Sequence, residues 1–323
     1  MKSIKLKTES ICSIKIRIFF LVFIFPFIVI SQSKGIAQRI GFDKNTKLLI
    51  IHADDIGLAH SVNTATIKAF EDGGINSASI MVPCPWFPEI AAYAKAHTKY
   101  DFGLHLTLNA EWENYRWGGV SSATEIPSLL DENEFFYRSV EEIVKYANPN
   151  EVEKELIAQV ERALAFGVKP THLDNHMGSL FSTPELFQIY LKIGKMYNLP
   201  VFIPMAAKNH YPELMELAGD HQVIVDKYMM MNTNRPVTEW NDFYLDIIQQ
   251  LKPGLNELIV HLAIDNSEAK AVMINHADFG STWRQNDLNT LLSKEFKDAL
   301  KDNNIKLITW KEISSLLHKM NGD

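Results

Sequence analysis

From residue 47 onward, short apolar runs alternate with longer segments in which apolar residues recur every three or four positions. The first pattern is typical of buried strands and the second of amphipathic helices. The predicted strands are residues 48–52, 78–82, 102–108, 171–174, 201–204, 223–225, 258–262 and 306–309. The predicted helices are residues 61–72, 87–96, 150–166, 183–197, 238–251, 287–303 and 311–319.

This alternation predicts an α/β fold with mainly parallel strands, because a crossover helix is the usual connection between parallel neighbours. About 280 residues show the pattern, which is close to the roughly 250 residues of a TIM-like (β/α) barrel. We therefore expect a single barrel domain. The least regular stretch, residues 109–136, directly follows a predicted strand, and a long insertion at that point is typical of an active-site loop.

The first 37 residues have the composition of a secretory signal peptide. Basic residues precede the uncharged apolar run 18–30, which is shorter than the roughly 20 residues that span a bilayer. Gly35 and Ala37 predict cleavage near Ala37, and Val29 with Ser31 offers a second cleavage position. We expect residues 1–37 to be removed and residues 38–323 to act outside the cytoplasm without stable membrane insertion. An uncleaved signal anchor is the alternative.

Composition narrows the classes of function. Hydrophobic residues make up 46% and charged residues 22% of the chain, which are ordinary globular values that exclude a disordered protein. The net charge of −7 argues against a nucleic-acid partner. The two cysteines, Cys12 and Cys84, are too few for a disulfide scaffold or a cysteine-based zinc site.

Polar side chains stand where several predicted strands end. Because parallel strands of a barrel open on the same face, residues far apart in sequence would meet there in one pocket. These residues are His52, Asp54 and Asp55 at the first strand, His105 in the third, His172, Asp174 and His176 at the fourth, His261 at a later strand, and His276 and Asp278 in the loop beyond it.

Aspartate and histidine side chains from separate strands suit a divalent metal held by oxygen and nitrogen. The adjacent Asp54 and Asp55 suggest that one ligates the metal while the other acts as a base. Asp54 and Asp55 have a structural alternative, since an aspartate at the end of a strand often caps the following helix. His105 has one too, because a lone histidine in an apolar strand is often a hydrogen-bonded core residue. Packing alone explains residues 172, 174 and 176 less well. Alternating strand positions share one face, and three polar side chains buried on one face are costly unless they have partners.

Several of these segments, in the same order, make the chain resemble YdjC-like carbohydrate deacetylases and, more distantly, NodB-type polysaccharide deacetylases. The resemblance runs from about Leu48 to about Ser293. It is carried by the segments Ala53-Asp54-Asp55-Ile56-Gly57-Leu58, Gly103-Leu104-His105-Leu106-Thr107, Thr171-His172-Leu173-Asp174-Asn175-His176, Glu257-Leu258-Ile259-Val260-His261 and Trp283-Arg284-Gln285.

The resemblance implies a distorted barrel and one divalent metal ion, with magnesium or zinc expected. It implies Asp55, His105 and His176 as metal ligands, Asp54 as the base that activates water and His261 as the general acid. His172, Asp174 and Arg284 would orient these groups. The chain departs from the family pattern at Met177-Gly178-Ser179 and at Leu262-Ala263, and His276 is a second candidate for the acid.

The expected function is metal-dependent removal of acetyl groups from N-acetylated sugars or oligosaccharides. The alternatives are an esterase or amidase acting on another small acylated substrate, and a catalytically inactive glycan-binding protein. A glycosidase is disfavoured, because it requires two carboxylates flanking the bond and the polar residues here are mostly histidines. The resemblance also allows a homodimer.

Four aromatic residues are candidates for stacking on sugar rings. Trp86, Trp112, Tyr115 and Trp117 follow the second and third predicted strands, where loops would border the pocket. Ordinary loop packing is the alternative for each of them.

Overall fold

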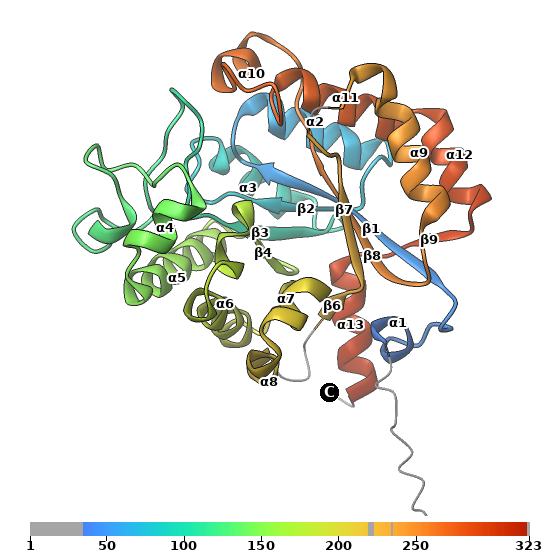
Figure 1. The fold of residues 1–323 in the computed structure, drawn as a ribbon, viewed down its shortest axis with the longest axis horizontal. Helices are drawn as coiled ribbons and strands as arrows, with labels where there is room; N and C mark the ends of the chain where they lie inside the picture. The colour runs from blue at the N-terminus through green and yellow to red at the C-terminus, as the bar shows by residue number, and fades with distance from the viewer. Residues whose placement is uncertain (1–34, 219–222, 234, 322–323) are drawn as a thin grey trace, which may run out of the picture. The chain divides into compact units, whose positions relative to one another are not determined.

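The computed structural model describes residues 35–218, 223–233 and 235–321 (Figure 1). Residues 1–34 of the predicted signal peptide lie outside the described residues, so signal-peptide cleavage stays a prediction. No helix within the described ranges is both long enough and apolar enough to cross a bilayer.

A curled parallel sheet forms the centre of the domain. Its hydrogen-bonded strand order is β4-β3-β2-β1-β8-β7, and β9 pairs with the first residues of β1. The strands are β1 (Lys47–Ile56), β2 (Ser77–Ile80), β3 (Phe102–Leu106), β4 (Leu173–Asn175), β7 (Lys227–Met230), β8 (Gly254–His261) and β9 (Ile305–Leu307). This arrangement confirms the predicted α/β fold with a TIM-like, mainly parallel barrel.

The remaining side of the barrel is irregular. Strands β5 (Phe202–Pro204) and β6 (Val223–Val225) form a separate parallel pair, which an isolated bridge between Leu173 and Val201 connects to β4. The chain runs from β6 into β7 through Asp226, and its backbone N–H donates to the Leu255 carbonyl on β8 at 2.9 Å. The barrel is therefore distorted where β4 meets β5 and where β6 gives way to β7.

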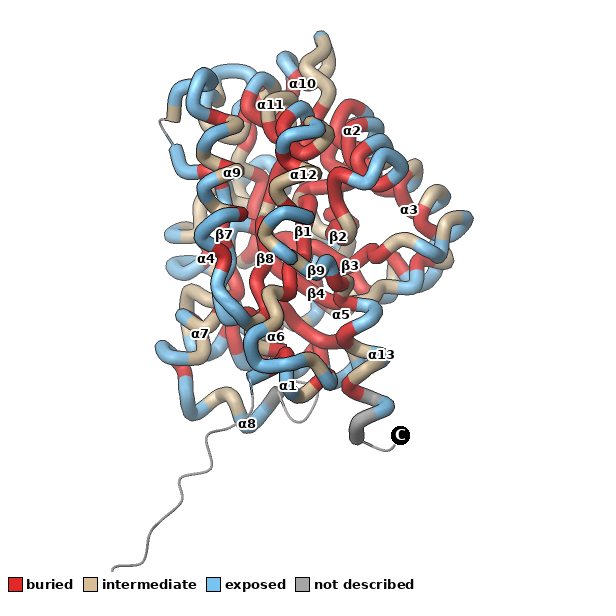
Figure 2. Tube along the Cα trace, turned by 90° about the vertical axis from the view of Figure 1, so that its right-hand side faces the viewer, coloured by how far each residue is buried: buried red, intermediate tan, exposed pale blue. Residues whose placement is uncertain are grey.

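Helices surround the sheet, and their buried faces pack against it (Figures 1 and 2). They are α1 (Ile36–Arg39), α2 (His60–Glu71), α3 (Phe87–Ala96), α4 (Val140–Tyr146), α5 (Pro149–Ala165), α6 (Pro184–Met196), α7 (Met205–His210), α8 (Met215–Ala218), α9 (Trp240–Gln250), α10 (Ser267–Val272), α11 (Ser281–Leu292), α12 (Lys294–Asp302) and α13 (Trp310–Asn321).

Two parts of the predicted pattern were wrong in detail. Residues 287–303 were expected to form one helix, but α11 ends before Ser293, whose hydroxyl accepts from Phe296 N at 3.1 Å and begins α12. Serine caps a new helix because its side chain satisfies a free backbone N–H. Strand β7 was not predicted.

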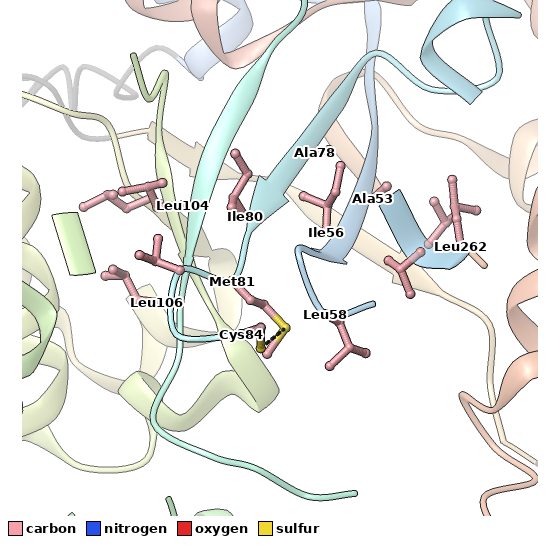
Figure 3. Packing of buried hydrophobic residues seen from close by; sticks show 14 of the residues in the cluster. Ala53, Ile56, Leu58, Ala78, Ile80, Met81, Cys84, Leu104, Leu106 and Leu262 are labelled. Carbon is pink, nitrogen blue, oxygen red and sulfur yellow. Dashed lines mark hydrogen bonds between the residues drawn. The ribbon is translucent and has the colours of Figure 1, made fainter. Parts of the chain in front are cut away.

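Period-two alternation divides each strand into an outward and an inward face. Outward residues such as Ala53, Ile56 and Ala78 pack with Ile80 and Leu104 beneath the covering helices (Figure 3). Inward residues of β1 are Leu48, Ile50, His52 and Asp54 in order along the strand. The inner face therefore changes from apolar to polar toward the carboxyl end of β1.

A second apolar cluster fills the amino-terminal end of the barrel. It joins Leu48 and Ile50 to Trp310 and Leu317 of α13 and to Ile36 and Ala37 of α1, among others. The buried carboxylate of Asp101 accepts the backbone N–H groups of Trp310 and Lys311, both at 3.0 Å, and so caps α13. The closed end directs access to the opposite end, where the polar side chains lie.

Candidate metal centre and active-site cavity

The end of β1 brings two adjacent carboxylates to one cavity. Neighbouring strand residues normally point to opposite faces, but the β1–β2 register shifts between Ala53 and Ile56. Asp55 also takes a left-handed backbone conformation, with φ of 66°. As a result Asp54 and Asp55 both line the cavity.

Asp55, His105 and His176 bring three potential metal-binding atoms together. Asp55 Oδ1 lies 3.4 Å from His105 Nε2 and 3.2 Å from His176 Nδ1, and the two ring nitrogens are 3.3 Å apart. Ligand atoms about 2.0–2.1 Å from a tetrahedral ion are about 3.3–3.4 Å apart. The buried Asp55 Oδ1 has no hydrogen-bond partner among the described residues. This triad therefore fits a divalent metal.

Carboxylates orient both histidines of the triad. His105 Nδ1 lies 2.7 Å from Asp174 Oδ1, and His176 Nε2 lies 2.9 Å from Glu111 Oε2. When the outer nitrogen of each ring donates its proton, the inner nitrogen presents its lone pair toward Asp55, as metal-binding histidines require. Sequence reasoning identified Asp174 but missed Glu111, although it singled out the loop 109–136 that contains it.

Two other groups of histidine and aspartate also come close together, namely His52 with His172 and Asp174, and Asp54 with His105 and Asp174. Both share Asp174, whose two oxygens already lie 2.7 Å from His105 and 2.9 Å from His52. The Asp55 triad keeps its donor atoms directed at one another and is therefore the better metal centre.

Arg284 holds the carboxylate of Asp55 from the other side. Its Nη2 donates to Asp55 Oδ2 at 2.7 Å, and its Nε donates to the Phe279 carbonyl at 2.7 Å. Burial alone would raise the pKa of Asp55, but the Arg284 charge and the two facing histidines hold this pKa well below its usual range. Asp55 is thus ionised, the form in which a carboxylate binds a metal.

Asp54 faces a different histidine, which sequence reasoning left without a role. His52 Nε2 lies 3.3 Å from Asp54 Oδ1 and 2.9 Å from Asp174 Oδ2. Its Nδ1 lies 2.9 Å from Ser77 Oγ. Burial alone would lower the pKa of His52, but the carboxylates of Asp174 and Asp54 raise it well above its ordinary value. The signal was present in the sequence, because His52 and Asp54 are two residues apart on an inward strand face.

His172 lies deeper in the barrel than the sequence-based role implied. Its ring stacks on Trp310 with centroids 5.0 Å apart and meets the ring of His52 edge-on at 5.1 Å. A Cβ atom on Gly103 would come within 2.4 Å of the His172 ring, so this packing requires glycine there. His172 therefore supports His52 by packing.

His261 enters the cavity from the end of β8. Its Nε2 lies 4.0 Å from Asp54 Oδ2 and 3.9 Å from Asp55 Oδ2. Its backbone N–H donates to Asp287 Oδ2 at 3.1 Å, and this buried carboxylate also accepts from Tyr244. Burial lowers the pKa of His261 to about 4 against the opposing charge of Asp55. His276 also lines the cavity but packs edge-on against Trp112, with centroids 4.6 Å apart.

The cavity has a volume of about 560 Å³ and contains all three triad residues, Asp54 and His261. Of the four aromatic residues expected to border it, only Trp112 does so. Trp117 is buried, Tyr115 donates to the Leu58 carbonyl at 2.9 Å, and Trp86 packs on His60. For these three residues the alternative of loop packing is the one that the structure supports.

Comparison with known proteins places the chain among its relatives. Residues 48–302 match the model of a family described as YdjC-like protein. The chain belongs to this YdjC-like family. The match covers the sheet except β9 and the first residue of β1, and it includes every residue of the triad.

Curated relatives of this YdjC-like chain carry the name carbohydrate deacetylase. A Thermus thermophilus protein is 34% identical over 245 residues, which cover 73% of this chain and 84% of the relative. A Brevibacillus brevis protein is 28% identical over 270 residues, which cover 82% and 99%. A crystal structure from Enterococcus faecalis, provisionally named for cellobiose-phosphate cleavage, is 22% identical, covers 83% of this chain and 99% of its own, and has a TM-score of 0.69. That likeness establishes the shared fold.

The triad predicts a graded loss of metal affinity. We expect the metal-free protein to bind about one equivalent of Zn²⁺ in a calorimetric titration, and His105→Ala to abolish this binding because it removes a ligand. Glu111→Gln should weaken binding about 10–100-fold, since it removes only the group that orients His176. Glu113→Gln is the matched control, because Glu113 contacts Asn275 from the same loop. Equal affinity in all variants would place the metal elsewhere.

Proposed function

We propose that this YdjC-like protein is a carbohydrate deacetylase, a hydrolase that removes acetyl groups from N-acetylated sugars with the help of a divalent metal. The observation that carries the proposal is a buried Asp-His-His triad with a further carboxylate, Asp54, at its side. The name shared by the curated relatives supports the substrate class.

Asp55, His105 and His176 would hold the metal. When bound, a divalent metal polarises an acyl carbonyl and lowers the pKa of water, which makes amide hydrolysis accessible at neutral pH. The remaining residues bind the substrate, position the attacking water and move its proton.

Asp54 is placed to accept that proton. Its Oδ1 lies 3.3 Å from His52 Nε2, and its Oδ2 lies on the side of His261. In the attack the water O–H bond breaks, its oxygen bonds to the acetyl carbon, and the proton passes to Asp54. Because Asp174 holds both His52 and His105, the base and a metal ligand keep a fixed relative position.

His261 is placed to complete the reaction. Its Nε2 lies 4.0 Å from Asp54 Oδ2, so the proton taken from water can pass through this ring to the leaving nitrogen. The C–N bond then breaks, and acetate and the free amine leave. His276 is the weaker candidate, since its ring is engaged with Trp112.

The same cavity suits an ester as well as an amide, so an O-acetyl esterase is the second candidate function. The position of Asp54 argues against an inactive glycan-binding protein, because sugar binding does not require a base beside a metal centre. Acetate release from matched N-acetylated and O-acetylated sugars separates these three functions.

Replacing the base tests the mechanism. Asp54→Asn keeps the shape of the side chain but cannot accept the proton, so acetate release should fall roughly 10²–10⁴-fold. The measurement is acetate released from N-acetylated oligosaccharides, with and without a chelator. Metal content should stay near that of the unchanged protein, and its loss would instead make Asp54 a ligand. The exposed Asp72→Asn, which removes an ion pair with Lys68, is the control.

The two histidines of the cavity can be told apart by the same assay. His261→Ala should lower kcat by roughly 10²-fold or more because the leaving amine loses its proton donor. His276→Ala should change KM more than kcat, since His276 packs beside the cavity wall. Full kcat in His261→Ala combined with a large loss in His276→Ala would reverse the assignment.

Export is proposed from the composition of residues 1–37, with one refinement. Cleavage after Ala37 would remove Ile36 and Ala37, which are buried against the second apolar cluster. We therefore expect cleavage at the upstream position, after Ser31, because it preserves α1. Amino-terminal sequencing of the protein from the extracytoplasmic fraction should begin at Gln32. A protein that begins at Gln38 would contradict this refinement, and a full-length membrane-bound protein would indicate an uncleaved anchor.

A further inference from the structure

One side of the cavity is apolar although it adjoins the metal centre. Alternate residues of three strands face it: Phe202 and Pro204 on β5, Tyr228 and Met230 on β7, and Ile259 on β8. We call these five residues the apolar wall.

Register connects this wall to the catalytic groups. Met230 pairs with Ile259 across β7 and β8, and Ile259 precedes His261 by two residues on the same strand face. Two residues of strand span about 6.6 Å. The apolar wall therefore begins beside the proposed acid and belongs to the same cavity.

The β7 part of the apolar wall faces open space, whereas Phe202 and Pro204 on β5 are buried. Tyr228 is 46% exposed and Met230 is 36% exposed, whereas Met229, which points the other way, is only 8% exposed. In a filled barrel the inward residues are the more buried ones. The inversion arises where the barrel is distorted, and it leaves a hollow lined by inward apolar side chains.

The chemistry of the wall selects its occupant. The hydroxyl groups of a second sugar would need hydrogen-bond partners, and the wall side chains offer only the Tyr228 hydroxyl. Buried hydroxyls without partners weaken binding, whereas alkyl or aryl groups gain from leaving water. The polar groups of the cavity are those of the triad, Asp54 and His261, and His261 stands next to Ile259 at one end of the wall.

We propose that the substrate is an acetylated sugar carrying an apolar alkyl or aryl group, and that the apolar wall binds this group. The inference rests on the proposed function, because the sugar's acetyl group must sit at the metal centre while the apolar group extends along β7. The group is attached at the anomeric oxygen of the acetylated sugar, or it extends the acyl group itself, so that a longer N-acyl chain stands in place of the acetyl group. The chemistry shared by both is a hydrocarbon chain beside the amide.

The test is a chain-length series. Acetate release is measured for the methyl, butyl, hexyl and octyl glycosides of N-acetylglucosamine and for its free β-1,4-linked disaccharide. We expect kcat/KM to rise with each methylene group, by up to roughly fourfold, until the wall is covered. A parallel series of N-butanoyl and N-hexanoyl glucosamine, followed by amine release, distinguishes the two attachment points.

Variants connect the effect to the wall. Met230→Gln and Tyr228→Gln should flatten the dependence of kcat/KM on chain length. The controls Met196→Gln and Tyr146→Gln replace side chains of similar exposure, 49% and 46%, that lie outside the cavity, and should keep it. The proposal would be overturned if kcat/KM did not depend on chain length, or if the dependence survived in both wall variants. It would also be overturned by a preference for the disaccharide that Tyr228→Gln removes.

A binding measurement separates this proposal from the proposed function. Calorimetric titration with hexyl and methyl glucosaminides, which lack the acetyl group, requires no catalysis. Tighter binding of the hexyl compound that Met230→Gln abolishes would support the wall even if no substrate released acetate. Equal binding of both compounds in an enzyme that does release acetate would refute the wall and leave the deacetylase standing.

Discussion

The site depends on one buried carboxylate, because each oxygen of Asp174 orients a different histidine. Oδ1 lies 2.7 Å from His105 Nδ1, and the other nitrogen of this ring faces Asp55. Oδ2 lies 2.9 Å from His52 Nε2, which also faces Asp54. A buried charge is costly unless it is paired. Here the pairing orients both rings, so the cost of burying Asp174 is offset by the same contacts that orient the candidate metal ligand His105 and the His52 ring beside the proposed base.

The barrel interior is divided by side-chain chemistry. Strands β1, β3 and β4 contribute histidines and carboxylates to the cavity, β5 and β7 contribute the mainly apolar side chains of the wall, and β8 contributes both Ile259 and His261. In the polar part, hydrogen bonds and ion pairs join His52, His105 and Asp174, while Asp55 Oδ1 is left without a hydrogen-bond partner among the described residues. The apolar part is open because the hydrogen-bonded sheet is interrupted between β4 and β5. The proposed reaction and the proposed recognition of an apolar group would thus use adjoining parts of one cavity.

Simple sequence patterns made much of the fold and site predictable. Short apolar runs correctly placed most strands, and period-two alternation predicted that Asp174 and His172 share a face. It could not predict the left-handed conformation of Asp55, which depends on a register shift with a strand remote in sequence. Glu111 was missed because it stands on an irregular loop, where no periodicity assigns a direction. Strand β7 was missed because its inward residues, Tyr228 and Met230, border the open cavity and are more exposed than Met229 on the outward face. The usual pattern of buried inward residues is therefore absent from this strand.

The central position of β1 also bears on how the chain acquires its activity during synthesis. The strand that carries Asp54 pairs with β8, so that Lys47 meets Gly254 and Asp54 meets His261. These contacts join residues about two hundred positions apart, and such distant pairing forms late and slowly. A ribosome-bound chain that ends before residue 254 has an incomplete β1 neighbourhood and none of the groups supplied by β8. The candidate site is therefore complete only when nearly the whole length has been translated, because β8 supplies both the strand neighbour of β1 and His261.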